Sequence, residues 1–208
     1  MKFINECFFG EIEVKKSGFY AGLFPLEKEE DVEHYLEECK KKYREARHHC
    51  YAYIFLEERE GIVQEHKKQS DGEPAKTAGM PILQRMEGLK LKNALLVVSR
   101  IFGGTLLGTG GLSRAYSDAA KNALDKAIFL ERIEGRELEL QIPYTLLGKL
   151  EYSFTEQEIS ILDKQFTENV VLKIRVKEEK YSDFEKQIRE YGTQVVFLAI
   201  KKCRWYTR

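Results

Sequence analysis

Apolar and polar residues alternate with two different periods in the first part of the chain. Within residues 27–46 the apolar side chains recur at three- and four-residue spacing, which predicts an amphipathic helix. Residues 7–14 and 18–23 show β-like alternation on either side of a turn at residues 15–18, which predicts a hairpin. The apolar stripe of the predicted helix consists of Val32, Tyr35, Leu36, Cys39 and Tyr43. Acids precede bases along this helix, so we interpret its charged run as a solvated face and not as a binding site.

The pattern predicts four more elements before residue 135. Residues 50–56 are rich in aromatic and β-branched side chains, which predicts a strand. Residues 92–100 are almost continuously apolar, which is typical of a central strand covered on both faces. Residues 78–86 and 115–130 predict helices, and the alanines of the second indicate a close approach to a sheet. The polar residues 57–77 between these elements predict a long loop.

The pattern changes after Gly135. Strands at residues 137–143, 159–166, 170–176 and 194–200 combine with helices at 144–152 and 181–191 in the order βαββαβ. That order predicts a ferredoxin-like unit, an antiparallel sheet with two helices on one face. The expected fold class is therefore α+β, with one domain at residues 1–134 and a ferredoxin-like domain at 135–208.

Composition narrows the functional classes. Lys plus Arg and Asp plus Glu number 34 each, and 43% of the 208 residues are hydrophobic. These values exclude a disordered or strongly basic chain, so any contact with nucleic acid must come from a local patch. No apolar run approaches 18 residues and no signal-peptide core is present, so we expect a cytoplasmic protein without membrane contact. The four cysteines form no CxxC pair, which predicts reduced thiols.

The second domain offers two possible nucleic-acid surfaces. In the predicted strand 170–176, apolar residues alternate with Lys173 and Arg175, which gives one apolar and one mostly basic face. An open sheet face is a common RNA platform, although the paired aromatics of an RNA-recognition motif are missing here. The tail at residues 201–208 mixes four cations with Trp205 and Tyr206, so it could stack on bases, bind phosphates or serve as an ordinary charged terminus.

The chemistry that stands out lies in three short motifs. His48, His49 and Cys50 suggest metal ligands, but neighbours on a strand point to opposite faces and could not all bind one ion. Asp71 and Glu73 sit in a turn and could cap a helix or pair with arginine, contact a ligand, or act in catalysis. We expect no catalytic residue, no metal and no cofactor, while these three alternatives stay open for Asp71 and Glu73.

The third motif is a glycine-rich stretch between the predicted strand 92–100 and helix 115–130. Its glycines are Gly103, Gly104, Gly108, Gly110 and Gly111. Such a turn directs backbone N–H groups and the positive end of a helix outward, which suits a phosphate. Close packing against a neighbouring element would explain the glycines equally well. No Gly-Lys-Ser/Thr follows, so the stretch is not a P-loop.

The three motifs, in this order, resemble those of the YigZ/IMPACT family. They read ARHHC from Ala46, SDGEPAKTAGMPIL from Ser70, and RIFGG followed by LGTGGLSRAY from Arg100. The resemblance covers essentially the whole chain. It implies a first domain of the ribosomal-protein-like type with a left-handed βαβ crossover, and relatives of the last domains of elongation factor G for both halves. Three positions depart from the family: Lys76 replaces a glycine, Ile101 replaces an aromatic, and the acidic turn has one Asp.

The resemblance also implies a role. Eukaryotic members regulate translation initiation by competing for an activator of a stress kinase, and RNA or ribosome binding is the usual suggestion for bacterial-type members. We therefore expect a non-catalytic protein that contacts RNA, the ribosome or a translation factor. The expected ligand-binding residues are Arg47, His48, His49, Asp71, Glu73, Lys76, Arg100, Gly103, Gly104, Gly108, Gly110, Gly111 and Arg114. Two other readings remain open: a hydrolase or phosphate-binding enzyme that uses Asp71, Glu73 and His48, and a regulator whose partner is a protein.

Overall fold

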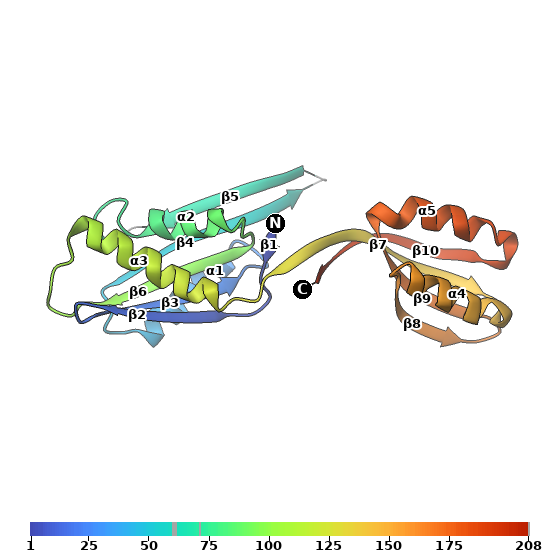
Figure 1. The fold of residues 1–208 in the computed structure, drawn as a ribbon, viewed down its shortest axis with the longest axis horizontal. Helices are drawn as coiled ribbons and strands as arrows, with labels where there is room; N and C mark the ends of the chain where they lie inside the picture. The colour runs from blue at the N-terminus through green and yellow to red at the C-terminus, as the bar shows by residue number, and fades with distance from the viewer. Residues whose placement is uncertain (60–61, 71, 208) are drawn as a thin grey trace. The chain divides into compact units, whose positions relative to one another are not determined.

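The computed structural model describes residues 1–59, 62–70 and 72–207. They form two compact units, Met1–Glu131 and Arg132–Thr207. Each unit combines one antiparallel sheet with helices (Figure 1), so the predicted two-domain α+β fold class is confirmed. The strand that passes from one unit to the next is β7 (Leu130–Ile142), and it includes Gly135. Within the described residues, no helix combines the length and the apolar character needed to cross a membrane.

The sheet of the first unit has five strands in the order β2–β3–β6–β4–β5. Their bounds are β2 (Phe8–Val14), β3 (Ser17–Pro25), β6 (Ala94–Ile101), β4 (His48–Arg59) and β5 (Ile62–Ser70). Because β3 and β4 are both antiparallel to β6, they are parallel to each other on its two sides. The connection between them is the helix α1 (Asp31–Lys42), so β3, α1 and β4 form a crossover unit.

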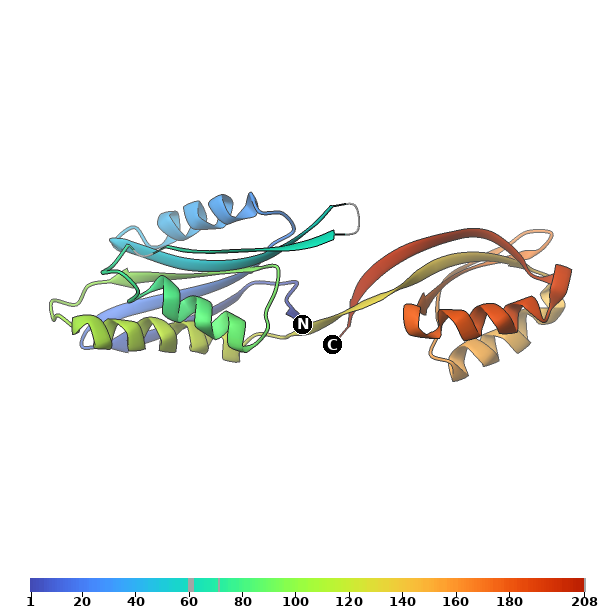
Figure 2. The same cartoon turned by 90° about the horizontal axis from the view of Figure 1, so that it is seen from above.

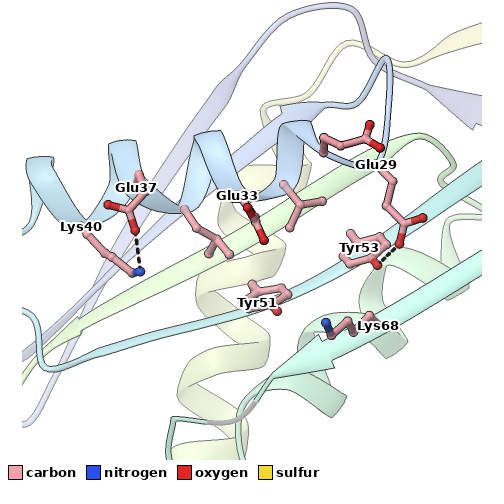
Figure 3. A pocket seen from close by; sticks show the side chains of 10 residues that line it. Glu29, Glu33, Glu37, Lys40, Tyr51, Tyr53 and Lys68 are labelled. Carbon is pink, nitrogen blue, oxygen red and sulfur yellow. Dashed lines mark hydrogen bonds and ion pairs between the residues drawn. The ribbon is translucent and has the colours of Figure 1, made fainter.

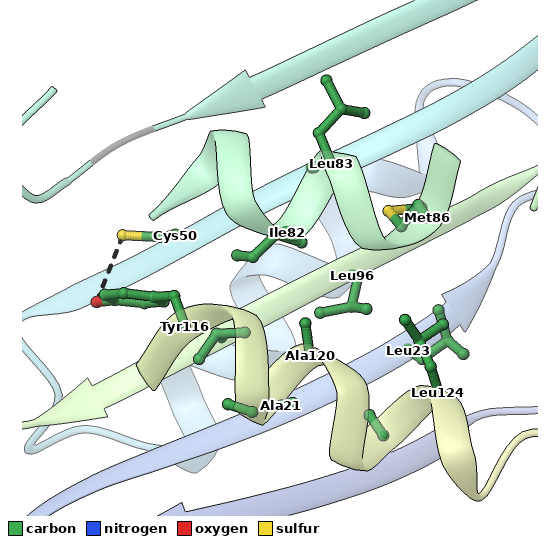
Figure 4. Packing of buried hydrophobic residues seen from close by; sticks show 14 of the residues in the cluster. Ala21, Leu23, Cys50, Ile82, Leu83, Met86, Leu96, Tyr116, Ala120 and Leu124 are labelled. Carbon is green, nitrogen blue, oxygen red and sulfur yellow. Dashed lines mark hydrogen bonds between the residues drawn. The ribbon is translucent and has the colours of Figure 1, made fainter. Parts of the chain in front are cut away.

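Helices cover both faces of this sheet. Helix α1 lies on one face, and α2 (Gly79–Gly88) and α3 (Gly108–Asp125) lie on the other, as Figure 2 shows. The first seven residues of β6 are all buried, which confirms the prediction of a strand covered on both faces. The core between the sheet and α2 and α3 is packed with Leu, Ile, Met and Ala side chains (Figure 4). Pro81 stands in the first turn of α2, where its missing N–H costs nothing.

Two predictions about the first unit are wrong. Much of the predicted loop 57–77 is strand, because β4 continues to Arg59 and β5 pairs with it from Ile62 to Ser70. The pattern gave no signal because β5 is an edge strand whose side chains are mostly exposed, so apolar alternation is not required. Likewise α3 begins at Gly108, and three glycines of the predicted turn lie in its first turn. Packing of the helix against the sheet outweighs the low helix propensity of glycine.

The close approach of α3 to the sheet, expected from its alanines, is confirmed. Ala115, Ala119, Ala120 and Ala123 are all at most 2% exposed. On the strand side the contact needs glycine, because a Cβ at Gly10 would lie 2.5 Å from the backbone nitrogen of Ala123. Helix and strand backbones therefore meet almost directly at this point.

The second unit has the predicted ferredoxin-like plan. After β7 come α4 (Tyr144–Glu156), β8 (Ser160–Phe166), β9 (Val170–Lys177), α5 (Glu178–Arg189), the short 3-10 turn Gly192–Gln194 and β10 (Val196–Thr207). The strand order is β10–β7–β9–β8, and both helices lie on one face of the sheet (Figure 2). The two-residue strand β1 (Lys2–Phe3) pairs with Glu131 and Leu130 at the start of β7.

On the uncovered face of this sheet, the structure bears on the two possible nucleic-acid surfaces of the second domain, the basic strand face and the tail. Lys173 and Arg175, the cations of the basic strand face, both lie near Glu137, at 3.6 and 2.6 Å. Residues 201–207 belong to β10, and the ring of Trp205 lies 5.0 Å from the guanidinium of Arg175. The charge of the basic face is thus offset in part by Glu137, and residues 201–207 form a strand instead of a loose charged terminus.

Candidate functional site

All three sequence motifs meet at one end of the first sheet. His48 at the start of β4 pairs with Arg100 near the end of β6, and Gly18 at the start of β3 pairs with Ile101. The segment after β5 and the loop that leads into α3 therefore lie at the same end, as does the β2–β3 turn (Figure 1). We call this the motif end. It comprises residues 15–17, 46–48, 72–78 and 100–114.

A buried ion pair forms the base of the motif end. Arg100 Nη1 lies 2.6 Å from Glu73 Oε1, and the two side chains are only 7% and 5% exposed. The Arg100 guanidinium also lies against the Phe19 and Phe102 rings, and its Nε has no hydrogen-bond partner within the described residues. Because breaking a buried pair leaves an uncompensated charge, Glu73 and Arg100 fix the 72–78 segment onto β6. Of the roles left open for Glu73, the structure favours the ion pair.

Two residues outside the predicted ligand-binding set extend this pair. The Tyr116 hydroxyl donates a 3.1 Å hydrogen bond to Glu73 Oε1, and the Cys50 thiol donates to the Tyr116 oxygen at 3.6 Å (Figure 4). Burial, with the neighbouring Cys50 and Glu73, raises the pKa of Tyr116, so the phenol stays protonated and acts as a donor. The available signal was a single tyrosine on the alanine-rich face of α3, where a hydroxyl needs a buried partner.

The two histidines of the first motif point to opposite faces, as the strand period predicted. His49 Nδ1 shares a 2.8 Å hydrogen bond with Ser99 Oγ, and burial lowers the pKa of this imidazole. His48 faces the other side, where a Cβ on Gly72 would lie 3.5 Å from its Nδ1. His48 thus lies beside the acidic turn, while His49 belongs to the α1 side of the sheet and is not part of the motif end's surface.

The glycines of the third motif serve different purposes. A Cβ at Gly103 would lie 2.0 Å from the Lys16 carbonyl oxygen, and its N–H donates to Ser17 Oγ at 3.1 Å. Gly103 is therefore a packing glycine, and its amide is already occupied. Gly104 and Gly108 have φ of +88° and +70°, the left-handed region that favours glycine. Gly110 and Gly111 follow in the first turn of α3, where no side chain among the described residues caps the helix.

Exposed cations lie at the motif end. Arg47 precedes β4, Lys76 lies in the 72–78 segment, and Arg114 lies in the second turn of α3; all three are exposed. Lys15 and Lys16, which the sequence had placed only in a turn, join them at the β2–β3 connection. Register and turn geometry thus gather five exposed cations that come from four separate segments of the chain.

A groove of the first unit lies away from the motif end. It has a volume of about 590 Å³ and lies between α1 and strands β4 and β5 (Figure 3). Its acidic lining residues are Glu29, Glu30, Glu33 and Glu37, joined by Tyr51, Tyr53, Lys40 and Lys68. We call it the acidic groove. The sequence assigned these acids to a solvated helix face, and the signal it lacked was their position opposite the tyrosines of β4.

Among the described residues, Glu73 does not fit the acid–base role that a hydrolase would require. The Glu73 carboxylate is buried and accepts hydrogen bonds from Arg100 and Tyr116, so it is not available as a solvent-facing base. Asp71, the second carboxylate of that hypothesis and an expected ligand-binding residue, lies outside the described residues. A general base must reach the proton that it removes, and the position of Glu73 does not meet that condition.

Comparisons with known proteins agree with the fold and cover most of the chain. Residues 15–124 match the family described as the Impact N-terminal domain, and residues 140–196 match a domain of unknown function, DUF1949. The IMPACT family member YvyE of Bacillus subtilis is 33% identical over 180 residues, 86% of this chain and 81% of that protein. The family member YigZ of Escherichia coli is 30% identical over 183 residues, 86% and 87% of the two chains. A crystal structure of a hypothetical protein aligns with a TM-score of 0.58 and 27% identity, covering 96% of this chain and 97% of that one.

Proposed function

Because this chain belongs to the IMPACT family, we propose that it is a non-catalytic binding protein linked to translation, and that its motif end contacts the phosphates of RNA. The observation that carries the proposal is that Arg47, Arg114 and three exposed lysines lie at the same end of the sheet as one buried ion pair. Phosphate contacts from Arg and Lys supply most of the sequence-independent affinity of nucleic-acid binding. Because acidic and basic residues are equal in number, the chain as a whole does not attract nucleic acid, so RNA binding requires a local cationic patch of this kind.

Each part of the motif end has a role in this proposal. The exposed side chains of Arg47, Lys76 and Arg114 contact phosphates directly. Arg100 does not, because its side chain is buried against Glu73; it positions the 72–78 segment instead. The first turn of α3 adds backbone N–H groups at the positive end of an 18-residue helix, which favours an anion. The likeness to the family supports translation as the setting of this binding.

The test measures the affinity of the full chain for a structured RNA hairpin, by fluorescence anisotropy between 50 and 200 mM salt. We expect the affinity to fall with salt, and the double variant Arg47→Gln/Arg114→Gln to lower the slope of log affinity against log salt by about two. The matched control is Lys28→Gln/Lys121→Gln, which removes the same charge from exposed positions outside the motif end.

Two results would overturn the proposal. One is an affinity that does not depend on salt in this range. The other is an equal loss of affinity in the control and in the Arg47/Arg114 variant. That result would mean that affinity depends on the net charge of the chain and not on the position of the cations. Binding of a protein that survives nuclease treatment, with no affinity for the hairpin, would favour a protein partner instead.

A further inference from the structure

The loop between β6 and α3 presents an exposed aromatic ring at the motif end. Phe102 is 50% exposed, although Arg100, two residues before it in β6, is buried. The backbone is held in place at the next residue, because Gly103 packs against the Lys16 carbonyl and donates its N–H to Ser17 Oγ. The ring therefore has an open surface on a well-anchored part of the chain.

The buried guanidinium of Arg100 lies against the Phe102 ring. The Arg100 guanidinium lies 5.4 Å from the centre of the Phe102 ring, and Glu73 holds that guanidinium in place. Arg100 and Phe102 lie two positions apart in an extended segment, so they share the α2/α3 face, whereas Ile101 points to the other face. Phe102 therefore presents its ring on the face of the buried ion pair.

A single exposed phenylalanine is ordinary on a protein surface, so the surroundings decide its meaning. Phe9 offers the comparison within the same unit: it is 45% exposed and Lys42 lies 4.3 Å from its ring. Phe9, however, packs edge-on against Phe24 at 5.9 Å and so belongs to the packing of the sheet. Phe102 instead lies between Arg100, whose strand partner His48 follows the exposed Arg47, and Gly103, which packs against the backbone of the exposed Lys16.

We propose that Phe102 stacks on an unpaired base of single-stranded RNA while the surrounding cations hold the adjacent phosphates. This inference rests on the proposed function and names its substrate class. Aromatic rings in a cationic setting bind single strands in this way, since every base has a π-face and stacking tolerates any sequence. In an RNA duplex the bases are stacked on one another, so a protein ring cannot reach their faces.

The experiment compares a 12-nucleotide RNA strand with the same strand annealed to its complement, again by anisotropy. Phe102→Ala should lower the affinity for the single strand by between about fivefold and a hundredfold and leave duplex binding unchanged. Phe102→Trp should retain the affinity, and the control Phe9→Ala should change neither. A 2-aminopurine base in the strand should lose fluorescence on binding the natural chain and keep it on binding Phe102→Ala.

The outcomes separate this inference from the proposed function. If single-strand binding depends on salt and on Arg47 and Arg114, yet Phe102→Ala binds as the natural chain does, the stacking inference fails alone. The same holds if Phe102→Ala weakens single strand and duplex equally, or if the 2-aminopurine signal is unchanged. If neither RNA binds in a salt-dependent way, the proposed function fails and takes this inference with it. Equal thermal midpoints for the natural chain and Phe102→Ala exclude misfolding as the cause.

Discussion

The motif end and the acidic groove place opposite charges in different surroundings of one unit. At the motif end, Glu73 and Arg100 are buried at 5% and 7% exposure, and the cations around them are exposed. In the acidic groove the pair of Glu37 and Lys40 is 58% and 53% exposed. Burial therefore separates a pair that fixes the backbone from one that water screens. The number of charges in a stretch of sequence therefore does not tell whether a charged residue fixes the backbone in a buried pair or lies in a pair that water screens.

The two regions also differ in sign, although the chain as a whole is balanced. The groove collects Glu29, Glu30, Glu33 and Glu37, whereas the exposed charges of the motif end are mostly cations. On the proposed function, RNA is attracted to the motif end and repelled by the acidic groove, and this difference would orient it as it approaches. A net charge of zero can thus hide a strongly polarised unit.

Substitution of Glu73 should have the largest effect. Glu73→Gln leaves Arg100 buried without a counter-charge, so we expect the first unit to lose about 3 to 5 kcal/mol of its free energy of unfolding. The measurement is urea denaturation followed by circular dichroism. The matched control is Glu37→Gln in the acidic groove, which breaks an exposed pair and should not move the transition. Equal shifts in the two variants would contradict the distinction drawn between the regions.

An alkaline titration tests the buried side of α1, beneath the acidic groove. Burial raises the pKa of the Cys39 thiol from 9.0 to about 11. Between these values the unfolded chain loses the proton and the folded chain keeps it, so stability falls as pH rises. Cys39→Ala removes this contribution, and the unfolding free energy of the natural chain should fall more steeply than that of the variant by up to about 1.4 kcal/mol per pH unit.

The comparison of slopes is what decides this second prediction. Tyr116, whose pKa is also raised, adds to the loss above pH 10 in both proteins and therefore cancels between them. Parallel slopes from pH 9 to 11 would show that Cys39 ionises as readily in the folded chain as in the unfolded one.

The smallest expected effect concerns the backbone of the motif end. Lys76 has φ of +63°, a conformation that costs a side chain with a Cβ. Lys76→Gly should therefore stabilise the first unit by up to about 1 kcal/mol, reduced by the greater freedom of glycine in the unfolded chain. Lys76→Ala is the control, because it removes the cation but keeps the strained backbone. A loss of stability in the glycine variant, matched by the alanine one, would mean that the lysine side chain matters more than the strain.

Prediction from the sequence worked where a pattern is enforced by burial. The strand β6, the apolar stripe of α1 and the ferredoxin-like order of the second unit all followed from periods of two or 3.6 residues. It failed for β5, whose exposed edge demands no apolar alternation, and for the start of α3, where packing overrides the low propensity of glycine.

For the candidate site, the sequence supplied the residue types and the family, because three ordered motifs survive as short strings. It could not distinguish an exposed cation such as Arg47 from a buried one such as Arg100, nor find the hydrogen bond from Tyr116 to Glu73. Those facts depend on strand register and on the packing of α3, which bring together residues far apart in the chain, 66 positions for Cys50 and Tyr116 and 86 for Ser17 and Gly103. The strings are local, whereas burial and contact are properties of the folded whole.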